Sequence, residues 1–187
     1  MSGARGLTDE TCRLKTAKYF LRPLHDTDLD VLFAHYGDPA VTEFLDIEPH
    51  GDIAKTQALL AWAKEIRSTG TGLRWRISDA KSGAFVGTCG FHRLVYKGGR
   101  RGEVGYDLDP VHRGRGVMGE VLPVILQFGF GALNLHRIEA MITPGNERSC
   151  ALLERHGFVR EGVLRDFRYF KGRFWDQILY ARLAPET

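Results

Sequence analysis

Cysteine is scarce in this chain, and no cysteine is placed as a metal ligand would be. The 187 residues include three cysteines, Cys12, Cys89 and Cys150. They are far apart in the sequence, and neither a C-x-x-C nor an H-x-x-x-H pair accompanies them. Structural zinc sites take their ligands from such closely spaced pairs, and disulfide frameworks use an even number of cysteines. We therefore expect free thiols and no metal.

Long apolar runs are also missing. A helix that crosses a bilayer needs roughly 20 predominantly apolar residues in succession, and no segment comes near this length. The first ten residues, MSGARGLTDE, lack the apolar core of a secretory signal. With 43% hydrophobic and 26% charged residues, the composition is typical of a folded globular protein. We expect a single soluble domain over residues 1–187 that is cytoplasmic and contacts no membrane.

Basic residues are few in the first 60 positions, where six Lys and Arg stand against ten Asp and Glu. From residue 61 onward the balance reverses, with twenty Lys and Arg against thirteen Asp and Glu. A basic region can bind nucleic acid or a phosphate-rich ligand and an acidic region can attract cations, although both can be solvated surfaces without a partner. Because no aromatic motif of an RNA-binding sheet is interleaved with the basic residues, we expect no nucleic-acid partner.

The hydrophobic pattern alternates along the chain between the period of a helix and that of a strand. It predicts helices at 26–36, 52–68, 116–133 and 146–156, and strands at 12–21, 73–78, 84–96, 102–108, 136–142, 158–170 and 173–183. The expected order is β-α-α-β-β-β-α-β-α-β-β. This order indicates an α/β (α+β) fold with about seven strands and about four helices.

Three glycines before the third predicted helix, Gly114, Gly116 and Gly119, form a G-x-G-x-x-G pattern. Dinucleotide-binding folds use this pattern, and Glu139 lies near the spacing of their ribose-binding acid. However, the preceding strand GEVGYDL is charged and alternating, whereas a dinucleotide-binding strand is a continuous apolar run that leads directly into the first glycine. The kinase V-A-I-K, H-R-D and D-F-G motifs and the Walker sequence of nucleotide triphosphatases are absent as well.

With these nucleotide-binding motifs set aside, the pattern indicates a glycine-rich turn at the start of a helix. Glycines there allow successive backbone N–H groups to converge on an anion, and the positive end of the helix dipole supports them. Arg113 and Arg115 add positive charge, so the stretch predicts a site for a diphosphate-bearing ligand. The alternative, in which the glycines only permit a tight connection, stays open. We expect Gly119 to be a small residue at which the helix packs closely.

The segments around this turn resemble the GNAT superfamily of acyl-CoA-dependent N-acyltransferases, in particular its RimJ/RimL-like branch. The turn RGRGVM matches the family's R-x-x-G-x-G/A motif, with Met118 in place of the last Gly or Ala. Further matches are GEVGYDLDP before the turn, and NERSCALLERHGFVREG and GRFWDQILYARL after it. The resemblance extends over nearly the whole chain and implies one GNAT-like domain.

The resemblance implies a mixed, mostly antiparallel sheet in which strands 102–108 and 136–142 splay apart. Acetyl-CoA would be the co-substrate, with its pyrophosphate on the glycine-rich turn and its pantetheine in the gap between the strands. No metal is implied. The implied cofactor-binding residues are Leu108, Asp109, Arg113, Gly114, Arg115, Gly116, Val117, Met118, Gly119 and Asn146.

Two residues are implied to take part in the chemistry. An amine attacks a thioester only when it is unprotonated, so a nearby base assists. Glu103 occupies the position of the family's general-base glutamate, and a solvated strand carboxylate is an equally good interpretation. Ser149 matches the serine that RimL-like enzymes are thought to use to protonate the leaving sulfur, and a helix-capping role is the alternative. Leu153 stands where many family members have a tyrosine, which favours Ser149.

The implied activity is acetyl-CoA-dependent acetylation of a primary amine, either a protein N-terminus or a small molecule, by direct attack in a ternary complex. A noncatalytic acyl-CoA-binding module is the alternative. Acceptor recognition is expected from the front of the chain, where Glu43, Asp46 and Glu48 could attract a cationic amine. The chain would act as a monomer or a homodimer.

Overall fold

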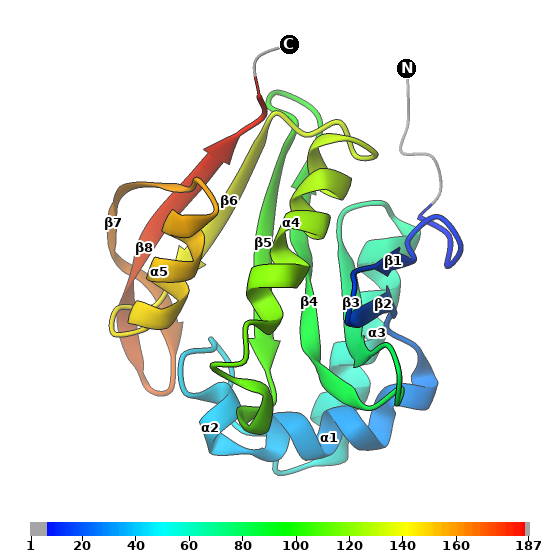
Figure 1. Cartoon of the computed structure of the whole chain (residues 1–187). Coiled ribbons are helices and arrows are strands. Elements are labelled where there is room, and N and C mark those ends of the chain that lie inside the picture. Colours follow the sequence, from blue (N-terminus) through cyan, green and yellow to red (C-terminus); the bar gives the residue numbers. More distant parts are fainter. Residues whose placement is uncertain (1–6, 186–187) are drawn as a thin grey trace.

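Eight strands pair into one sheet in the order β1-β2-β3-β4-β5-β6-β8-β7 (Figure 1). This arrangement is that of a computed structural model, which describes residues 7–185. Neighbouring strands are antiparallel except β5 and β6, which are parallel. The strands are β1 (Leu14–Lys15), β2 (Tyr19–Pro23), β3 (Leu73–Asp79), β4 (Phe85–Val95), β5 (Arg101–Leu108), β6 (Arg137–Ile142), β7 (Val159–Phe170) and β8 (Arg173–Leu183).

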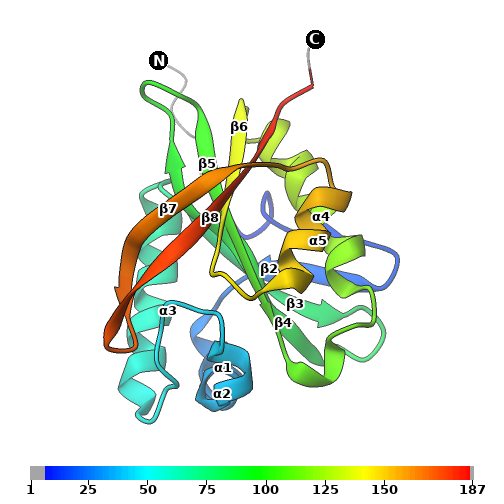
Figure 2. The ribbon, with the colours of Figure 1, turned by 90° about the vertical axis from the view of Figure 1, so that its left-hand side faces the viewer.

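Helices cover both faces of the sheet, and Figure 2 shows α3 on one side with α4 and α5 on the other. Each face has a core of its own: a large cluster forms under α4 and α5, and a smaller one is shared by α1 and α3. The helices are α1 (Leu29–Gly37), α2 (Pro39–Thr42), α3 (Ile53–Ser68), α4 (Val117–Phe130) and α5 (Glu147–Arg155), with the 3-10 turns η1 (Asp26–Asp28) and η2 (Pro110–His112).

Helix α4 is the most deeply buried of these elements, as its apolar sequence predicts. Its residues Val121, Leu122 and Ile125 are fully buried, and they belong to the same cluster as Trp75 and Phe91 of the sheet. Burial of a large apolar side chain contributes about 1.5–3 kcal/mol relative to leaving it exposed. This packing fixes the start of α4, and with it the glycine-rich turn, against the middle of the sheet.

The predicted order of elements is confirmed, with two additions. The expected first strand at 12–21 is divided into β1 and β2 by a turn, because Glu120 of α4 accepts hydrogen bonds from the Thr16 hydroxyl (2.6 Å) and the Lys18 backbone N–H (2.8 Å). The short helix α2 begins at Pro39, where the side chain of Asp38 accepts a hydrogen bond from the Ala40 N–H. The described residues therefore form eight strands and five α-helices rather than about seven and about four.

The structure of residues 7–185 bears on the expectations about cysteines and about long apolar helices. All three cysteines are buried and carry free thiols, as predicted. In this range no helix is both long enough and apolar enough to cross a membrane.

Candidate functional site

Strands β5 and β6 separate partway along their length and form a fork (Figure 1). They pair at only three positions, Arg101 with Arg137, Gly102 with Ile138 and Glu103 with Glu139, after which no rung joins them. The splay implied by the resemblance is therefore present. A cavity of about 520 Å³ lies at this fork, and it is lined by both strands, the N-terminus of α5, and the segment between α2 and α3.

The glycine-rich turn next to the fork has the features of an anion site. Gly114 and Gly116 have φ angles of 72° and 77°, a left-handed conformation that side-chain-bearing residues rarely adopt. Within the described chain, the backbone N–H groups of residues 114–119 donate to no protein acceptor. Unpaired N–H groups at the positive end of a helix dipole bind phosphate oxygens.

The expectation that α4 packs closely at Gly119 is wrong. A Cβ atom added there would meet no atom within 4 Å, so the helix does not pack closely at this residue. Gly119 instead lies on the exposed side of the first turn of α4, beside the buried Val117 and Met118. The open surface above the turn is suited to a diphosphate that must approach the backbone.

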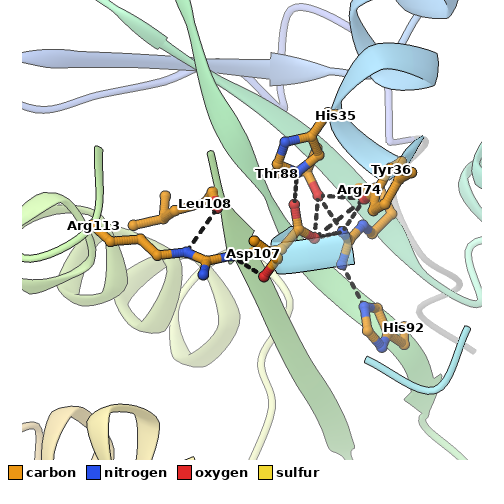
Figure 3. A network of polar contacts seen from close by, with 9 residues as sticks. His35, Tyr36, Arg74, Thr88, His92, Asp107, Leu108 and Arg113 are labelled. Atoms are coloured by element: carbon orange, nitrogen blue, oxygen red, sulfur yellow. Dashed lines mark hydrogen bonds and ion pairs between the residues drawn. The ribbon is translucent and has the colours of Figure 1, made fainter. Parts of the chain in front are cut away.

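Arg113 is bound to protein backbone rather than standing free above the turn (Figure 3). Its Nε donates to the Leu108 carbonyl at 3.2 Å, and its Nη2 donates to the Ala40 carbonyl at 2.8 Å. Arg113 thus links the turn to β5 and to α2. Asp109 is also engaged, since its N–H bonds the Val86 carbonyl and its carboxylate caps η2. The roles of Leu108, Asp109 and Arg113 in cofactor binding stay predictions, as does that of the exposed Arg115.

Glu103 lies at the last paired position of the fork, and its carboxylate lines the cavity. Its Oε1 accepts a hydrogen bond from Nη2 of Arg168 on β7 at 2.8 Å. Arg168 also bonds the carboxylate of Asp46 from the segment before α3. One guanidinium therefore joins two carboxylates at the edge of the cavity, a relationship that the sequence did not predict.

The N-terminus of α5 borders the same cavity as Glu103. The side chain of Asn146 accepts a hydrogen bond from the Ser149 N–H at 3.2 Å and so caps the N-terminus of α5. Asn146 and Ser149 both line the cavity. Since the cap uses the backbone N–H of Ser149, the serine hydroxyl is not needed to cap the helix.

Tyr106 is a polar residue of the fork that sequence reasoning missed. Its hydroxyl is buried, lines the cavity and forms no hydrogen bond with the described residues. Burial raises the pKa of Tyr106 to about 12, while the nearby Ser149 acts in the opposite direction. Buried hydroxyl groups almost always have a partner, so an unpartnered one in a cavity indicates a ligand position. The available signal was that Tyr106 is the one polar side chain among positions 102, 104, 106 and 108.

A buried polar network lies on the α1 and α3 side of the fork (Figure 3). Asp107 accepts hydrogen bonds from His35 Nε2 at 2.7 Å, Arg74 Nη2 at 2.9 Å, Thr88 Oγ1 at 2.8 Å and the Tyr36 hydroxyl at 3.2 Å. Burial alone would raise the pKa of Asp107, but the His35 hydrogen bond and the Arg74 charge outweigh it and hold this pKa well below its usual range. Asp107 is therefore a charged structural centre of the cavity wall.

His92 extends this network to the cavity. Its Nε2 accepts a hydrogen bond from Arg74, and its ring packs edge to face against Trp62. Burial, followed by the Arg74 charge, lowers the pKa of His92 to about 3. A Cβ atom on Gly105 would lie 2.3 Å from Cε1 of His92, so the strand needs glycine here. A histidine that is neutral and already accepts a hydrogen bond at Nε2 is a poor general base.

The acidic residues expected to attract a cationic amine do not form such a site. Only Asp46 of the three lines the cavity, and Arg168 neutralises it, whereas Glu43 and Glu48 lie outside. A second hollow of about 340 Å³ adjoins the cavity at Glu103 and Arg168. Among residues 7–185, no group of three or more His, Cys, Asp or Glu side chains is arranged to hold a metal ion.

The chain is similar to several known acetyltransferases. A family model described as an acetyltransferase (GNAT) domain matches residues 18–159. The uncharacterized N-acetyltransferase p20 of Bacillus licheniformis is 35% identical over 173 residues, which cover 92% of this chain and 97% of p20. The ribosomal protein uS5-alanine N-acetyltransferase of Escherichia coli is 28% identical over 178 residues, or 93% and 92% of the two chains. A spermidine N-acetyltransferase structure from Vibrio cholerae, in complex with CoA and spermine, superposes with a TM-score of 0.77 at 24% identity over 88% of this chain and 95% of that one.

Proposed function

The chain belongs to the GNAT family of N-acetyltransferases, and we propose that it transfers the acetyl group of acetyl-CoA to a primary amine by direct attack in a ternary complex. The observation that carries this proposal is the fork of β5 and β6, with an anion site on one side and a carboxylate, Glu103, on the other. A donor and an acceptor that enter from opposite faces would meet between the two strands.

The residues of the fork and the turn fit acetyl-CoA. The unpaired N–H groups of residues 114–119 suit its pyrophosphate, and the unpaired β5 edge beyond Glu103 suits the amides of its pantetheine arm. Asn146 at the start of α5 would contact the same arm. When bound, acetyl-CoA supplies an activated acetyl group as a thioester.

Glu103 and Ser149 are proposed to manage the two protons of the reaction. An α-amino group has a pKa of about 8 and must lose a proton before it attacks the carbonyl carbon. The Glu103 carboxylate takes this proton, directly or through water. As the C–S bond breaks, the Ser149 hydroxyl gives its proton to the sulfur and takes up the second proton that the attacking nitrogen loses. Tyr106 lies beside Ser149 with a free hydroxyl and orients the thioester.

No covalent enzyme intermediate is needed for this reaction. Cys150, which follows Ser149, is buried and belongs to the large core under α4 and α5. A nucleophilic cysteine would need a base beside it and access to the substrate. Direct transfer is therefore the route proposed.

The acceptor amine is proposed to lie in the cavity on the α1 and α3 side of the sheet, where Glu103, His92 and the segment before α3 form the wall, with the rest of the acceptor in the adjoining second hollow. It would be a protein N-terminus or a small-molecule amine. The E. coli relative is named for the alanine of a ribosomal protein, which supports a protein N-terminus.

A panel of amines tests the proposal. The protein is mixed with acetyl-CoA and N-terminal peptides, polyamines or aminoglycosides, and the release of free thiol is followed. We expect thiol release that depends on one class of amine and on both substrates together. Tight binding of CoA without amine-dependent release from any compound would overturn the proposal and favour a noncatalytic acyl-CoA-binding module.

A further inference from the structure

The carboxylates on the acceptor side of the site all have guanidinium partners, although three guanidinium groups serve four carboxylates. Four of them line the cavity or the adjoining second hollow, and each has a guanidinium partner within the described part of the chain. Asp107 bonds Arg74, Asp46 and Glu103 share Arg168, and Glu139 bonds Arg137. A polyamine carries further ammonium groups that need carboxylate partners, and none of these four is left unpaired.

Three cations in the same region have no carboxylate partner among residues 7–185. Lys55, in the first turn of α3, lines the cavity, and Arg93 and Arg101 line the second hollow. All three side chains are exposed, and none forms a hydrogen bond or an ion pair with another described residue. Among the described residues, the acceptor side of the site therefore has three unpaired cations, and each of its carboxylates already has a guanidinium partner.

The positions of Arg93 and Arg101 relative to Glu103 are set by the pairing of β4 and β5. Arg93 is directly opposite Glu103 in the β4–β5 register, and Arg101 precedes Glu103 by two residues on the same face of β5. Two residues of a strand span roughly 7 Å. A chain that extends from Glu103 along the second hollow would bring its second and third residues to these arginines, because an extended peptide advances at the same rate.

The wall of the second hollow also suits a peptide. Phe167, Met141 and Leu179 line it beside the arginines, and Phe167 is half exposed. Apolar side chains beside fixed charges fit the backbone and side chains of an extended chain better than a small hydrated anion.

We propose that the acceptor is a peptide or protein N-terminus whose second and third residues are acidic. This inference rests on the proposed acetyl transfer and names the acceptor class for the same site. The amine lies between Glu103 and Ser149, and the acidic side chains pair with Arg93 and Arg101. A polyamine is selected against because its second ammonium group would face these guanidinium groups without a carboxylate to balance it.

Matched peptides test the inference. Three peptides share the N-terminal serine and differ only at the second and third residues, which are acidic, neutral amide or lysine; a fourth carries the acidic pair at the sixth and seventh residues. Spermidine is the polyamine probe. We expect kcat/KM for the first peptide to exceed that of each other amine about tenfold at low salt, and the advantage to shrink as salt screens the charges.

Charge-reversal variants identify the residues that produce the preference for the acidic peptide. Arg101→Glu and Arg93→Glu should abolish the preference for the acidic peptide or invert it in favour of the lysine peptide. Lys97→Glu makes the same change of charge in the β4–β5 turn, outside both hollows, and should keep the preference. Thermal melting of each variant confirms that it is folded.

The outcomes separate the two proposals. Faster acetylation of spermidine or of the lysine peptide would overturn the acidic-acceptor inference and leave acetyl transfer standing. Equal rates for all four peptides, or a preference unchanged by Arg101→Glu and Arg93→Glu, would overturn it too. If no amine is acetylated, both proposals fall.

Discussion

Arg168 on β7 donates a hydrogen bond to Glu103 on β5 across 2.8 Å, although the two residues are 65 positions apart in the sequence. The same guanidinium bonds Asp46 from the segment that covers the cavity. Arg168 thus holds the Glu103 carboxylate in place at the fork. It also links this carboxylate to the segment that forms the acceptor side of the cavity. A base that is fixed in this way needs no reorganisation when the amine arrives.

Glu103→Gln tests the assignment of the base. We expect kcat to fall about a hundredfold or more, the usual size of a general-base contribution, and its rise with pH to flatten. The Kd of acetyl-CoA should not change, because Glu103 lies on the acceptor side. Initial rates between pH 6 and 9 measure this. Glu161→Gln, which also removes a carboxylate paired with an arginine but lies outside the cavity, is the matched control. A normal pH profile in Glu103→Gln would remove Glu103 from the mechanism.

Ser149→Ala and Tyr106→Phe together identify the proton donor to the leaving sulfur. With a pKa raised to about 12, Tyr106 stays protonated at neutral pH and could also donate. We expect Ser149→Ala to lower kcat about tenfold or more, and Tyr106→Phe to act mainly on KM for acetyl-CoA. Steady-state kinetics separate the two effects. A larger loss of kcat in Tyr106→Phe than in Ser149→Ala would transfer the role to the tyrosine.

Gly119→Ala tests the site for the pyrophosphate. The added methyl group meets no protein atom, and alanine is the better helix former, so thermal stability should be kept or slightly raised. The methyl group would stand where the phosphates approach the backbone, and we expect the Kd of CoA to rise about tenfold, which is about 1.4 kcal/mol. Calorimetric titration measures it. Gly162→Ala, another open glycine, is the control and should bind normally. Unchanged affinity in Gly119→Ala would place the pyrophosphate elsewhere.

His92 makes the stability of the protein depend on pH. Its pKa is lowered to about 3 in the fold, so between this value and about 6.5 the unfolded chain binds a proton that the folded chain does not. Stability contributed by neutral His92 is therefore complete above pH 7 and is lost as the pH falls. We expect His92→Gln to lose less unfolding free energy between pH 7 and pH 5 than the wild type, by about 1 kcal/mol per pH unit or less.

Urea titrations at several pH values measure this difference. The pKa of Asp107 and that of Asp28 are lowered in the fold, so their contributions are present above pH 4 and are lost only in more acidic solution. Between pH 5 and pH 7 the change in unfolding free energy therefore reports on histidine and not on these two aspartates. Identical pH slopes in the wild type and His92→Gln would contradict the assignment.

The secondary structure could be read from the sequence because it depends on local patterns, and the outline of the site followed from the family resemblance. Apolar spacing identified α3 and α4, and turn residues bounded the strands of the sheet. Family motifs placed Glu103, Ser149 and the glycine-rich turn around one fork. These inferences rest on residues close together in the chain.

The contacts that set the chemistry of the site could not be read in this way. Arg168 meets Glu103, and Arg74 meets Asp107, only through the register of the sheet. The open surface at Gly119 depends on what packs against α4, and the neutralisation of Asp46 depends on a residue on β7. Such partners are fixed by tertiary structure, and no local pattern encodes them.

The most direct test of the account is to follow an isotopically labelled acetyl group from acetyl-CoA by mass spectrometry, in the presence of an acidic N-terminal peptide. Direct transfer predicts that the label appears on the amine of the peptide, that free CoA is released in equal amount, and that the enzyme itself carries no label. A labelled enzyme, or CoA release without acetylated peptide, would contradict direct transfer to an amine at the fork of β5 and β6.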